Sequence, residues 1–344
     1  MRVLFDIVHP AQVHFFRHAI RLLKARGDSV LVTARKKDIA IELLNALGIE
    51  HTCISSKGAN MAAMGFELVT RTFRLIKLAR KFRPDVMVAR VGHSVGPAGK
   101  ILGIPTVIYD DMEHARLQAA IGMTFATYIC TGLGYYRDLG ARQVRFNAPP
   151  VLSYLGPKYF TPDPAPLRAA GIDPDKPCIF IRTVSWKASH DVGRKGTSMR
   201  ELTELVEALS GFGRVIISSE DPLPAELLKY KNPLPAEYIH HLLAFAQLCI
   251  VEGGTMAEEA AVLGTPAICP KTYDFGYLRA LQKDYGLLFR PATTAQALEI
   301  AETILRQPDC KQQFRQKRQR LLEDSEDVVE FMLKMIDLAA APNR

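Results

Sequence analysis

Two adjacent glycines lie where an apolar strand meets a helix. The run LCIV (Leu248–Val251) continues into EGGTMAEE, Glu252–Glu259. Glycines have no Cβ, so a ligand can approach their backbone closely, and the N-terminus of the following helix presents unpaired N–H groups to an anion. We predict that Gly253, Gly254 and Thr255 donate to a diphosphate; a turn without a ligand is the alternative. The segment contains neither G-x-G-x-x-G nor Gly-Lys-Ser/Thr, so neither a Rossmann dinucleotide site nor a P-loop is supported.

Two carboxylates follow in the first turns of the same helix, Glu258 and Glu259. The helix dipole stabilises negative charge there, and this is a purely structural explanation for them. The functional alternative is that one of them accepts hydrogen bonds from the ribose hydroxyls of a nucleotide. Because the sequence alone does not distinguish them here, both Glu258 and Glu259 are candidate nucleotide ligands.

Polar residues also follow the first apolar run, VLFDIV (Val3–Val8), where His9, Gln12 and His14 precede or begin an amphipathic helix. In a doubly wound sheet this position is a switch point that faces the ligand. A histidine titrates near neutral pH, so it suits the general base that removes a proton from an acceptor hydroxyl. The alternative is a histidine that caps or packs against its own helix.

Acidic residues gather after a later strand, in the segment YDDMEHAR. Asp110, Asp111, Glu113 and His114 lie within it. Clustered carboxylates at a strand end could orient or deprotonate an acceptor, or could supply the acid and base of an epimerase.

The strand IFIRTVS (Ile179–Ser185) ends in a basic segment. We predict Arg182 and Ser185 as nucleotide ligands, and Trp186, the single tryptophan, could stack on a sugar or base. Four more basic residues of this segment could offset charge on a departing diphosphate: Lys187, His190, Arg194 and Lys195.

The elements that must position these residues alternate between strand and helix, which is typical of parallel sheets with crossover helices. The segments Asp85–Ile108 and Leu248–Ile268 both run strand, glycine turn, small-residue helix, Leu-Gly-x-Pro, strand. We therefore predict an α/β protein with two Rossmann-like doubly wound domains. Prolines concentrated in Pro149–Pro166 mark the linker. The expected divisions are residues 1–155 for an acceptor domain, 156–325 for a nucleotide-sugar domain, and 326–344 for a C-terminal helix that packs back on the first domain.

The segment Phe66–Asp85 allows two interpretations. The first is a surface helix that packs its apolar stripe, which includes Phe73 and Leu75, on the sheet and turns its charges, among them Arg71, to water. The second is a basic amphipathic patch that rests on anionic lipid, for which Met61, Met64 and Phe66 provide apolar contacts.

Composition limits the function classes. The chain has 344 residues, 48% hydrophobic and 23% charged, with a formal net charge of +8, which excludes disordered, fibrous and disulfide-scaffold proteins. Its six cysteines are scattered, with no C-x-x-C pair and no His at zinc-finger spacing, so we interpret most of them as reduced thiols of the core. Asp6 interrupts the first apolar run, so we do not expect this run to serve as a secretory signal. No apolar run reaches the ~18 residues that cross a bilayer. We expect a cytoplasmic protein, at most peripheral to the membrane, and no nucleic-acid partner because the basic stretch Lys311–Arg320 has no aromatic platform.

The segment VEGGTMAEEAAVLGTPAI resembles the nucleotide-binding segment of the GT-B superfamily, which includes the lipid II N-acetylglucosaminyltransferase and the non-hydrolysing UDP-N-acetylglucosamine 2-epimerases. Arg83–Asp111 is similar to a segment of the transferase's N-terminal domain. The opening D-I-x-H-P-x-x-V-H-F-F and this segment together resemble a little-characterised prokaryotic family of that superfamily. The resemblance implies two domains facing a cleft, with a UDP-sugar held mainly by the second.

The same resemblance assigns residues. It matches Glu259 to a ribose-binding glutamate, Gly254 and Thr255 to the phosphate turn, and His14 to a histidine of the transferase, although the glycines of that transferase's loop are missing here. The expected activity is a glycosyltransferase of cell-surface polysaccharide synthesis, metal-independent and inverting, that needs no cofactor beyond its NDP-sugar donor and uses His14 or Asp111 as base. The acceptor is a glycan or a lipid-linked sugar. A UDP-sugar 2-epimerase, whose Arg-Pro-Glu run is missing, and a non-catalytic sugar-nucleotide-binding protein are the alternatives.

Overall fold

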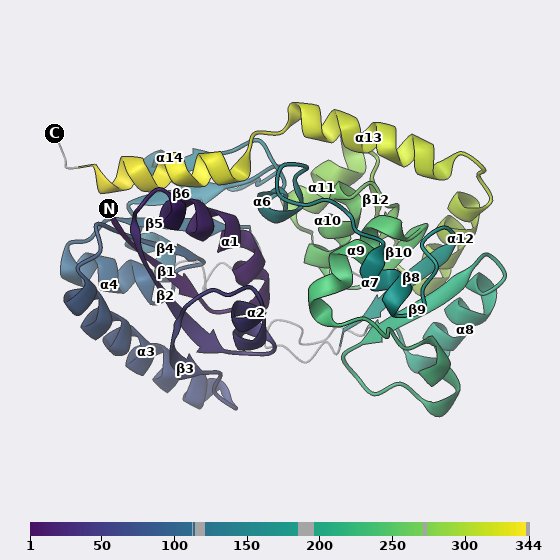
Figure 1. Ribbon diagram of the computed structural model, residues 1–344, viewed down its shortest axis with the longest axis horizontal. Helices are drawn as coiled ribbons and strands as arrows, with labels where there is room; N and C mark the ends of the chain where they lie inside the picture. The colour runs from purple at the N-terminus through teal and green to yellow at the C-terminus, as the bar shows by residue number, and fades with distance from the viewer. Residues whose placement is uncertain (112, 114–120, 185–195, 271–273, 342–344) are drawn as a thin grey trace. The chain divides into compact units, whose positions relative to one another are not determined.

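The computed structural model describes residues 1–111, 113, 121–184, 196–270 and 274–341. The chain divides into two compact units (Figure 1). Met1–Tyr154 with Glu326–Arg344 form unit 1, and Leu155–Ser325 form unit 2. Each unit contains a parallel sheet with helices packed against it, which confirms the predicted pair of doubly wound α/β domains.

Unit 1 is built on seven parallel strands in the order β3-β2-β1-β4-β5-β6-β7. The strands are β1 (Arg2–Ile7), β2 (Ser29–Lys36), β3 (Thr52–Ser56), β4 (Val86–Arg90), β5 (Thr106–Asp110), β6 (Tyr128–Thr131) and β7 (Gln143–Arg145). The chain first adds strands on one side of β1 and then returns to its other side, so β1 and β4 are neighbours. Such a switch point places a ligand at the carboxyl ends of the strands.

Helices cover both faces of this sheet (Figure 1). They are α1 (Pro10–Ala25), α2 (Ala40–Ala46), α3 (Met61–Phe82), α4 (Val95–Leu102) and α14 (Val328–Ala340). The short α6 (Leu152–Leu155) lies where the chain passes from unit 1 to unit 2. Helices α3 and α4 pack on Leu4 and Met87 on one face. On the opposite face Phe16 of α1 contacts Phe5, with ring centroids 5.3 Å apart. Because Leu4 and Phe5 are adjacent in β1, their side chains point to opposite faces of the sheet.

The end of the chain belongs to unit 1. Asn147 donates its N–H to the Glu326 carboxylate at 2.7 Å, just before α14 begins. Further along, Arg26 at the end of α1 donates to Asp337 of α14 with two hydrogen bonds of 2.8 Å. Helices α1 and α14 are therefore held together although they are distant in sequence.

Unit 2 has five parallel strands in the order β12-β11-β10-β8-β9. They are β8 (Cys178–Thr183), β9 (Arg214–Ser219), β10 (Leu248–Val251), β11 (Ala267–Ile268) and β12 (Leu288–Phe289). The switch point lies between β8 and β10, which pair in the register Arg182 to Val251. The glycine turn follows β10 directly, so it lies at this switch point.

The helices of unit 2 include two, α12 and α13, that follow the last strand. The set comprises α7 (Ala165–Ala169), α8 (Met199–Leu209), α9 (Ile239–Phe245), α10 (Gly254–Val262), α11 (Gly276–Lys283), α12 (Thr294–Leu305) and α13 (Cys310–Asp324), with 3-10 turns at Ala225–Tyr230 and Ala236–Tyr238. The sequence pattern predicts a tail from Gln296 to Ala341 that is helical throughout. The structure divides this tail into α12, which ends at Leu305, α13, which ends at Asp324, and α14, which belongs to unit 1.

Helix α3 corrects the first interpretation of its segment. Leu75 and Ala79 pack on the sheet as expected, but Arg71 is buried and Phe73 is 68% exposed. Arg71 faces inward because it forms an ion pair with Asp6 of β1. No helix in the described part of the chain combines the length and the apolar character that crossing a bilayer requires.

Candidate functional site

The glycine turn ends β10 and opens α10. Gly253 is the N-cap residue, in an extended conformation, and as a glycine it has no side chain of its own to cap the helix. The N–H groups of a helix's first turn have no acceptor within the helix, and the dipole makes this end positive. Residues 253–256 are half-buried. The turn therefore offers a set of backbone donors to an anion at the switch point of unit 2.

The two glycines have different surroundings. A Cβ on Gly253 would find no atom of the described residues within 4 Å, whereas a Cβ on Gly254 would lie 3.0 Å from the Tyr277 hydroxyl and 3.1 Å from a ring carbon of Phe275. Phe275 and Tyr277 stack at 5.2 Å at the start of α11. A side chain at Gly254 would thus crowd Phe275 and Tyr277, whereas one at Gly253 would meet no described residue.

Glu259 lies further along α10 from this turn. It is 6% exposed, and its Oε1 is 3.1 Å from Nε2 of His240. Glu258 is fully buried. His240 belongs to α9 and was missed by the sequence analysis, since nothing local in the sequence connects it to Glu259. The pairing fixes the orientation of the predicted ribose-binding carboxylate.

A second missed residue is Glu252, which immediately precedes the glycines. Its carboxylate accepts the N–H of Val184 at 2.9 Å through Oε2 and the N–H of Thr197 through Oε1. Its position directly after the apolar strand is the signal that could have identified it. Ser185, Trp186, Lys187, His190, Arg194 and Lys195 lie outside the described residues.

Two charged residues near the turn are already engaged. Arg182 donates to Ser218 and to Glu220, both at 2.9 Å, so its side chain is turned toward β9. Asp274 is paired with Arg279 and Arg290. Partial burial alone would raise the pKa of Asp274, but the hydrogen bonds from both arginines outweigh this effect and lower it.

At the switch point of unit 1, His9 is the N-cap of α1. Its Nδ1 accepts the N–H of Ala11 at 3.2 Å, so the proton of the neutral ring is on Nε2. Its side chain is exposed, yet surrounding protein atoms lower its pKa by desolvation, and four nearby cations lower it further: Lys37, Arg90, Arg35 and Lys57. A neutral His9 offers an Nε2–H donor at neutral pH and is a poor base.

His14 lies farther along α1 and is 8% exposed. Its ring stacks on Tyr154 with centroids 5.4 Å apart, and its Nδ1 is 3.4 Å from Arg17. Arg17 also donates to the Tyr154 carbonyl at 3.2 Å. These contacts hold the imidazole in a packed cluster within unit 1.

The carboxylates at and after the end of β5 are buried, and both aspartates are hydrogen-bonded. Both oxygens of Asp111 accept from Arg90, one of them at 3.2 Å. Asp110 accepts the Tyr135 hydroxyl at 2.7 Å, and Glu113 is 1% exposed. The structure thus brings Asp111 to β4 through Arg90, whereas His114 lies outside the described residues.

Gln12 connects β1 and β4 at the same place. Its Oε1 accepts the N–H of Val8 at 2.8 Å, and its Nε2 donates to the Arg90 carbonyl at 3.4 Å. Beyond Arg90 the chain passes through Val91, a β-branched residue with φ of 69°. A non-glycine residue in this region costs about 1–3 kcal/mol, and such strain is concentrated at functional sites.

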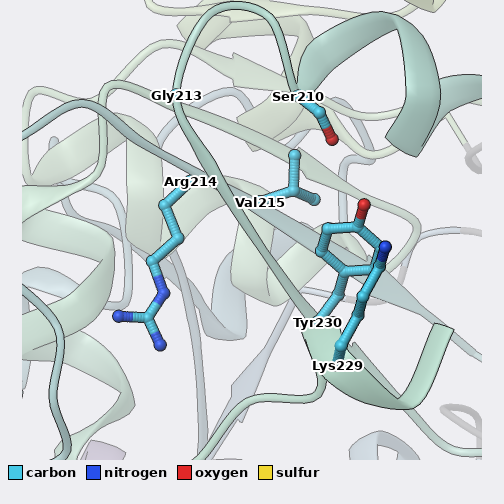
Figure 2. Close-up of a pocket in the computed structure, with 6 residues that line it drawn as sticks. All are labelled: Ser210, Gly213, Arg214, Val215, Lys229 and Tyr230. Atoms are coloured by element: carbon cyan, nitrogen blue, oxygen red, sulfur yellow. The ribbon is translucent and has the colours of Figure 1, made fainter.

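A separate pocket of about 350 Å³ lies at the opposite edge of the unit 2 sheet (Figure 2). It is lined by Ser210, Gly213, Arg214, Val215, Lys229 and Tyr230. Tyr230 points its hydroxyl toward Ser210, and Lys229 lies along its ring with Nζ 5.0 Å from the centroid (Figure 2). Because β9 begins at Arg214, this pocket is at the amino edge, away from the glycine turn and from the edge where α/β sheets bind nucleotides.

Among the residues that the structure describes, no group of three or more His, Cys, Asp or Glu side chains is arranged to hold a metal ion.

Solved structures of two enzyme classes are similar to the whole chain. A UDP-GlcNAc 2-epimerase from Neisseria meningitidis bound to UDP-GlcNAc has a TM-score of 0.71 at 13% identity, covering 98% of this chain and 99% of that one. The spinosyn forosaminyltransferase SpnP has a TM-score of 0.66 at 17% identity, covering 99% of each chain. The calicheamicin glycosyltransferase CalG4 has a TM-score of 0.59 at 14% identity, also covering 99% of each. At these identities the likeness establishes the fold, and the chain has the GT-B fold that the sequence predicted.

Sequence comparison finds a relative in Methanocaldococcus jannaschii. The uncharacterised protein MJ0665 is 24% identical over 277 residues, which cover 77% of this chain and 80% of the relative. Residues 1–340 match the family model described as "Protein of unknown function (DUF354)".

Proposed function

Starting from the fact that this chain belongs to the DUF354 family, we propose that it is a glycosyltransferase that moves a sugar from an NDP-sugar to a glycan or lipid-linked acceptor. The observation that carries the proposal is the N-terminus of α10 at the switch point of unit 2, where the N-cap Gly253 has no side chain and no atom of the described residues lies close to its Cβ position. A leaving diphosphate needs this kind of fixed, non-titrating donor set. The GT-B fold shared with SpnP and CalG4 supports the reaction class.

On this proposal the donor is a UDP-sugar. The diphosphate binds to the N–H groups of Gly253, Gly254 and Thr255, and Glu259, oriented by His240, accepts the ribose hydroxyls. The UDP-GlcNAc bound to the Neisseria epimerase supports uracil as the nucleobase of the donor, because that enzyme has the same fold.

The chemical step needs an acceptor hydroxyl, a base and a stabilised leaving group. The hydroxyl oxygen forms a bond to the anomeric carbon, the bond from that carbon to the diphosphate oxygen breaks, and the configuration inverts. The proton passes to a carboxylate or imidazole, for which Asp111 and His14 remain our candidates. The negative charge passes to the diphosphate, where the α10 donors stabilise it without a required metal ion or other cofactor.

Of the two bases we favour Asp111. Arg90 holds both of its oxygens in place, whereas His14 is stacked on Tyr154 within a packed cluster. His9, as a neutral donor, would hydrogen-bond to an oxygen of the acceptor. We place the reaction in the cytoplasm, in the synthesis of cell-surface polysaccharide.

The decisive experiment is calorimetric binding of UDP, GDP, ADP and CMP in the presence of EDTA. We expect selective UDP binding, weakened at least tenfold, or about 1.4 kcal/mol, by Glu259→Ala because a charged hydrogen bond to the ribose is lost. Glu259→Gln keeps an acceptor for His240 and should lose less, and Glu226→Ala, at an exposed glutamate, is the matched control. Absence of binding by every nucleotide would remove the transferase proposal.

A 2-epimerase is the second candidate, because the epimerase structure has the higher TM-score of those compared. It would interconvert a UDP-sugar without any acceptor, so incubation of the donor alone followed by chromatography separates the two activities. Tight UDP binding without turnover in either assay would instead indicate a non-catalytic sugar-nucleotide-binding protein.

A further inference from the structure

The inner face of the first half of α3 is charged. Glu67 and Arg71 lie one turn apart, and both are less than 9% exposed. Glu67 accepts from Arg35 at 2.7 Å, and Arg71 forms two hydrogen bonds to Asp6 of 2.7 Å and 2.5 Å. These buried ion pairs connect α3 to β1 and β2, so the rotation of the helix about its axis is fixed.

The outer face of the same half is apolar. Met61 is 71% exposed, Phe66 73%, Val69 54% and Phe73 68%. An ordinary surface helix buries its large apolar side chains and exposes its charges. Here the order is reversed, and a cluster of large exposed apolar side chains of this kind marks an interaction surface.

Cations complete this outer face toward the end of the helix. Arg74, Lys77, Arg80 and Lys81 are exposed. Helix α4 lies beside α3 on the same face of the sheet (Figure 1) and adds exposed Lys100 and Ile101. The only carboxylate in the two helices is the buried Glu67, so their exposed surface is apolar and purely cationic.

We propose that this surface of α3 and α4, defined by Met61, Phe66, Val69, Phe73, Lys77, Arg80, Lys100 and Ile101, docks the protein on an anionic lipid bilayer. The apolar side chains enter the boundary between headgroups and acyl chains, and the cations contact the lipid phosphates. Charge complementarity selects this partner, because nothing on the surface would repel a negative membrane. The helix lies in the plane of the interface and does not cross it. This inference concerns binding alone and does not depend on the proposed reaction.

The test is flotation of the full-length protein with vesicles of phosphatidylcholine, with and without about one third phosphatidylglycerol. We expect binding to the anionic vesicles that weakens with added salt. The double variants Phe66→Ser with Phe73→Ser, and Lys77→Gln with Arg80→Gln, should each weaken it about tenfold or more. The matched controls, Leu338→Ser at an exposed position of α14 and Arg200→Gln with Arg315→Gln in unit 2, should bind as the wild type does.

Two outcomes would overturn the proposal. One is that α3 variants float as well as the wild type. The other is that wild-type protein does not float with anionic vesicles; if it also forms a dimer in sedimentation equilibrium that the Phe66 and Phe73 substitutions dissociate, this face is a contact between copies of the chain. Because the substituted side chains are exposed, circular dichroism should show unchanged folding in all variants.

Discussion

In unit 2 the carboxyl edge of the sheet presents backbone N–H groups from a helix whose N-cap residue is a glycine, while in unit 1 Asp6 and Asp111 at the same edge form ion pairs. Asp6 is bonded to Arg71, and Asp111 to Arg90. Backbone donors do not titrate and cannot rotate away, so they suit a fixed anion. Paired side chains hold their geometry through charge, so they suit a substrate that must be oriented. The two units would therefore hold a ligand by different means, backbone donors in unit 2 and ion-paired side chains in unit 1, and substitutions can test each means on its own.

Asp6→Ala should have the largest effect on stability. It leaves Arg71 buried without its partner, and removal of one member of a buried pair costs about 3–5 kcal/mol. Urea unfolding should show an earlier transition for unit 1, with UDP binding retained at low urea. The double variant with Arg71→Met leaves no unpaired charge and should lose less; equal losses in both variants would mean that the ion pair is not the cause.

The two glycines of unit 2 should respond differently. Gly254→Ala pushes against Tyr277 and should cost about 1–3 kcal/mol of stability through overpacking, relieved in part by Tyr277→Phe. Gly253→Ser supplies a favoured N-cap and should keep stability, yet it fills the open space and should weaken UDP binding about tenfold, or 1.4 kcal/mol. Calorimetry that shows unchanged UDP affinity for Gly253→Ser would place the diphosphate elsewhere.

The smallest effect concerns pH and His9. Because folding lowers its pKa, the unfolded chain takes up a proton below about pH 6.5 while the folded chain does not, so stability is present above this pH and is lost as the pH falls toward 3. The exposed ring is screened by solvent, so we expect less than about 1 kcal/mol. His9→Asn keeps an N-cap acceptor and removes the titration. Urea midpoints at pH 7.5 and 5.5 should differ less for the variant than for the wild type; identical differences would contradict this role.

The sequence predicted what depends on local pattern. Alternating strands and helices are sufficient for two doubly wound domains, and glycines after an apolar strand are sufficient to place Gly253 at a helix start. Both features arise from residues that are near one another in the chain.

What the sequence could not predict depends on distant partners. Hydrophobic pattern predicted Phe73 inside and Arg71 outside, but the buried Asp6, 65 residues away, reverses this choice. In the same way, His240 becomes visible only when the fold brings it to Glu259. The residue that a side chain at Gly254 would crowd, Tyr277, likewise lies on another helix.

Glu252 has a consequence for cooperativity. Its one carboxylate follows β10 directly and accepts the N–H of Val184, just after β8, and the N–H of Thr197, just before α8. Loss of this carboxylate would therefore remove both hydrogen bonds at once, so the end of β8 and the start of α8 would lose their connection to β10 together.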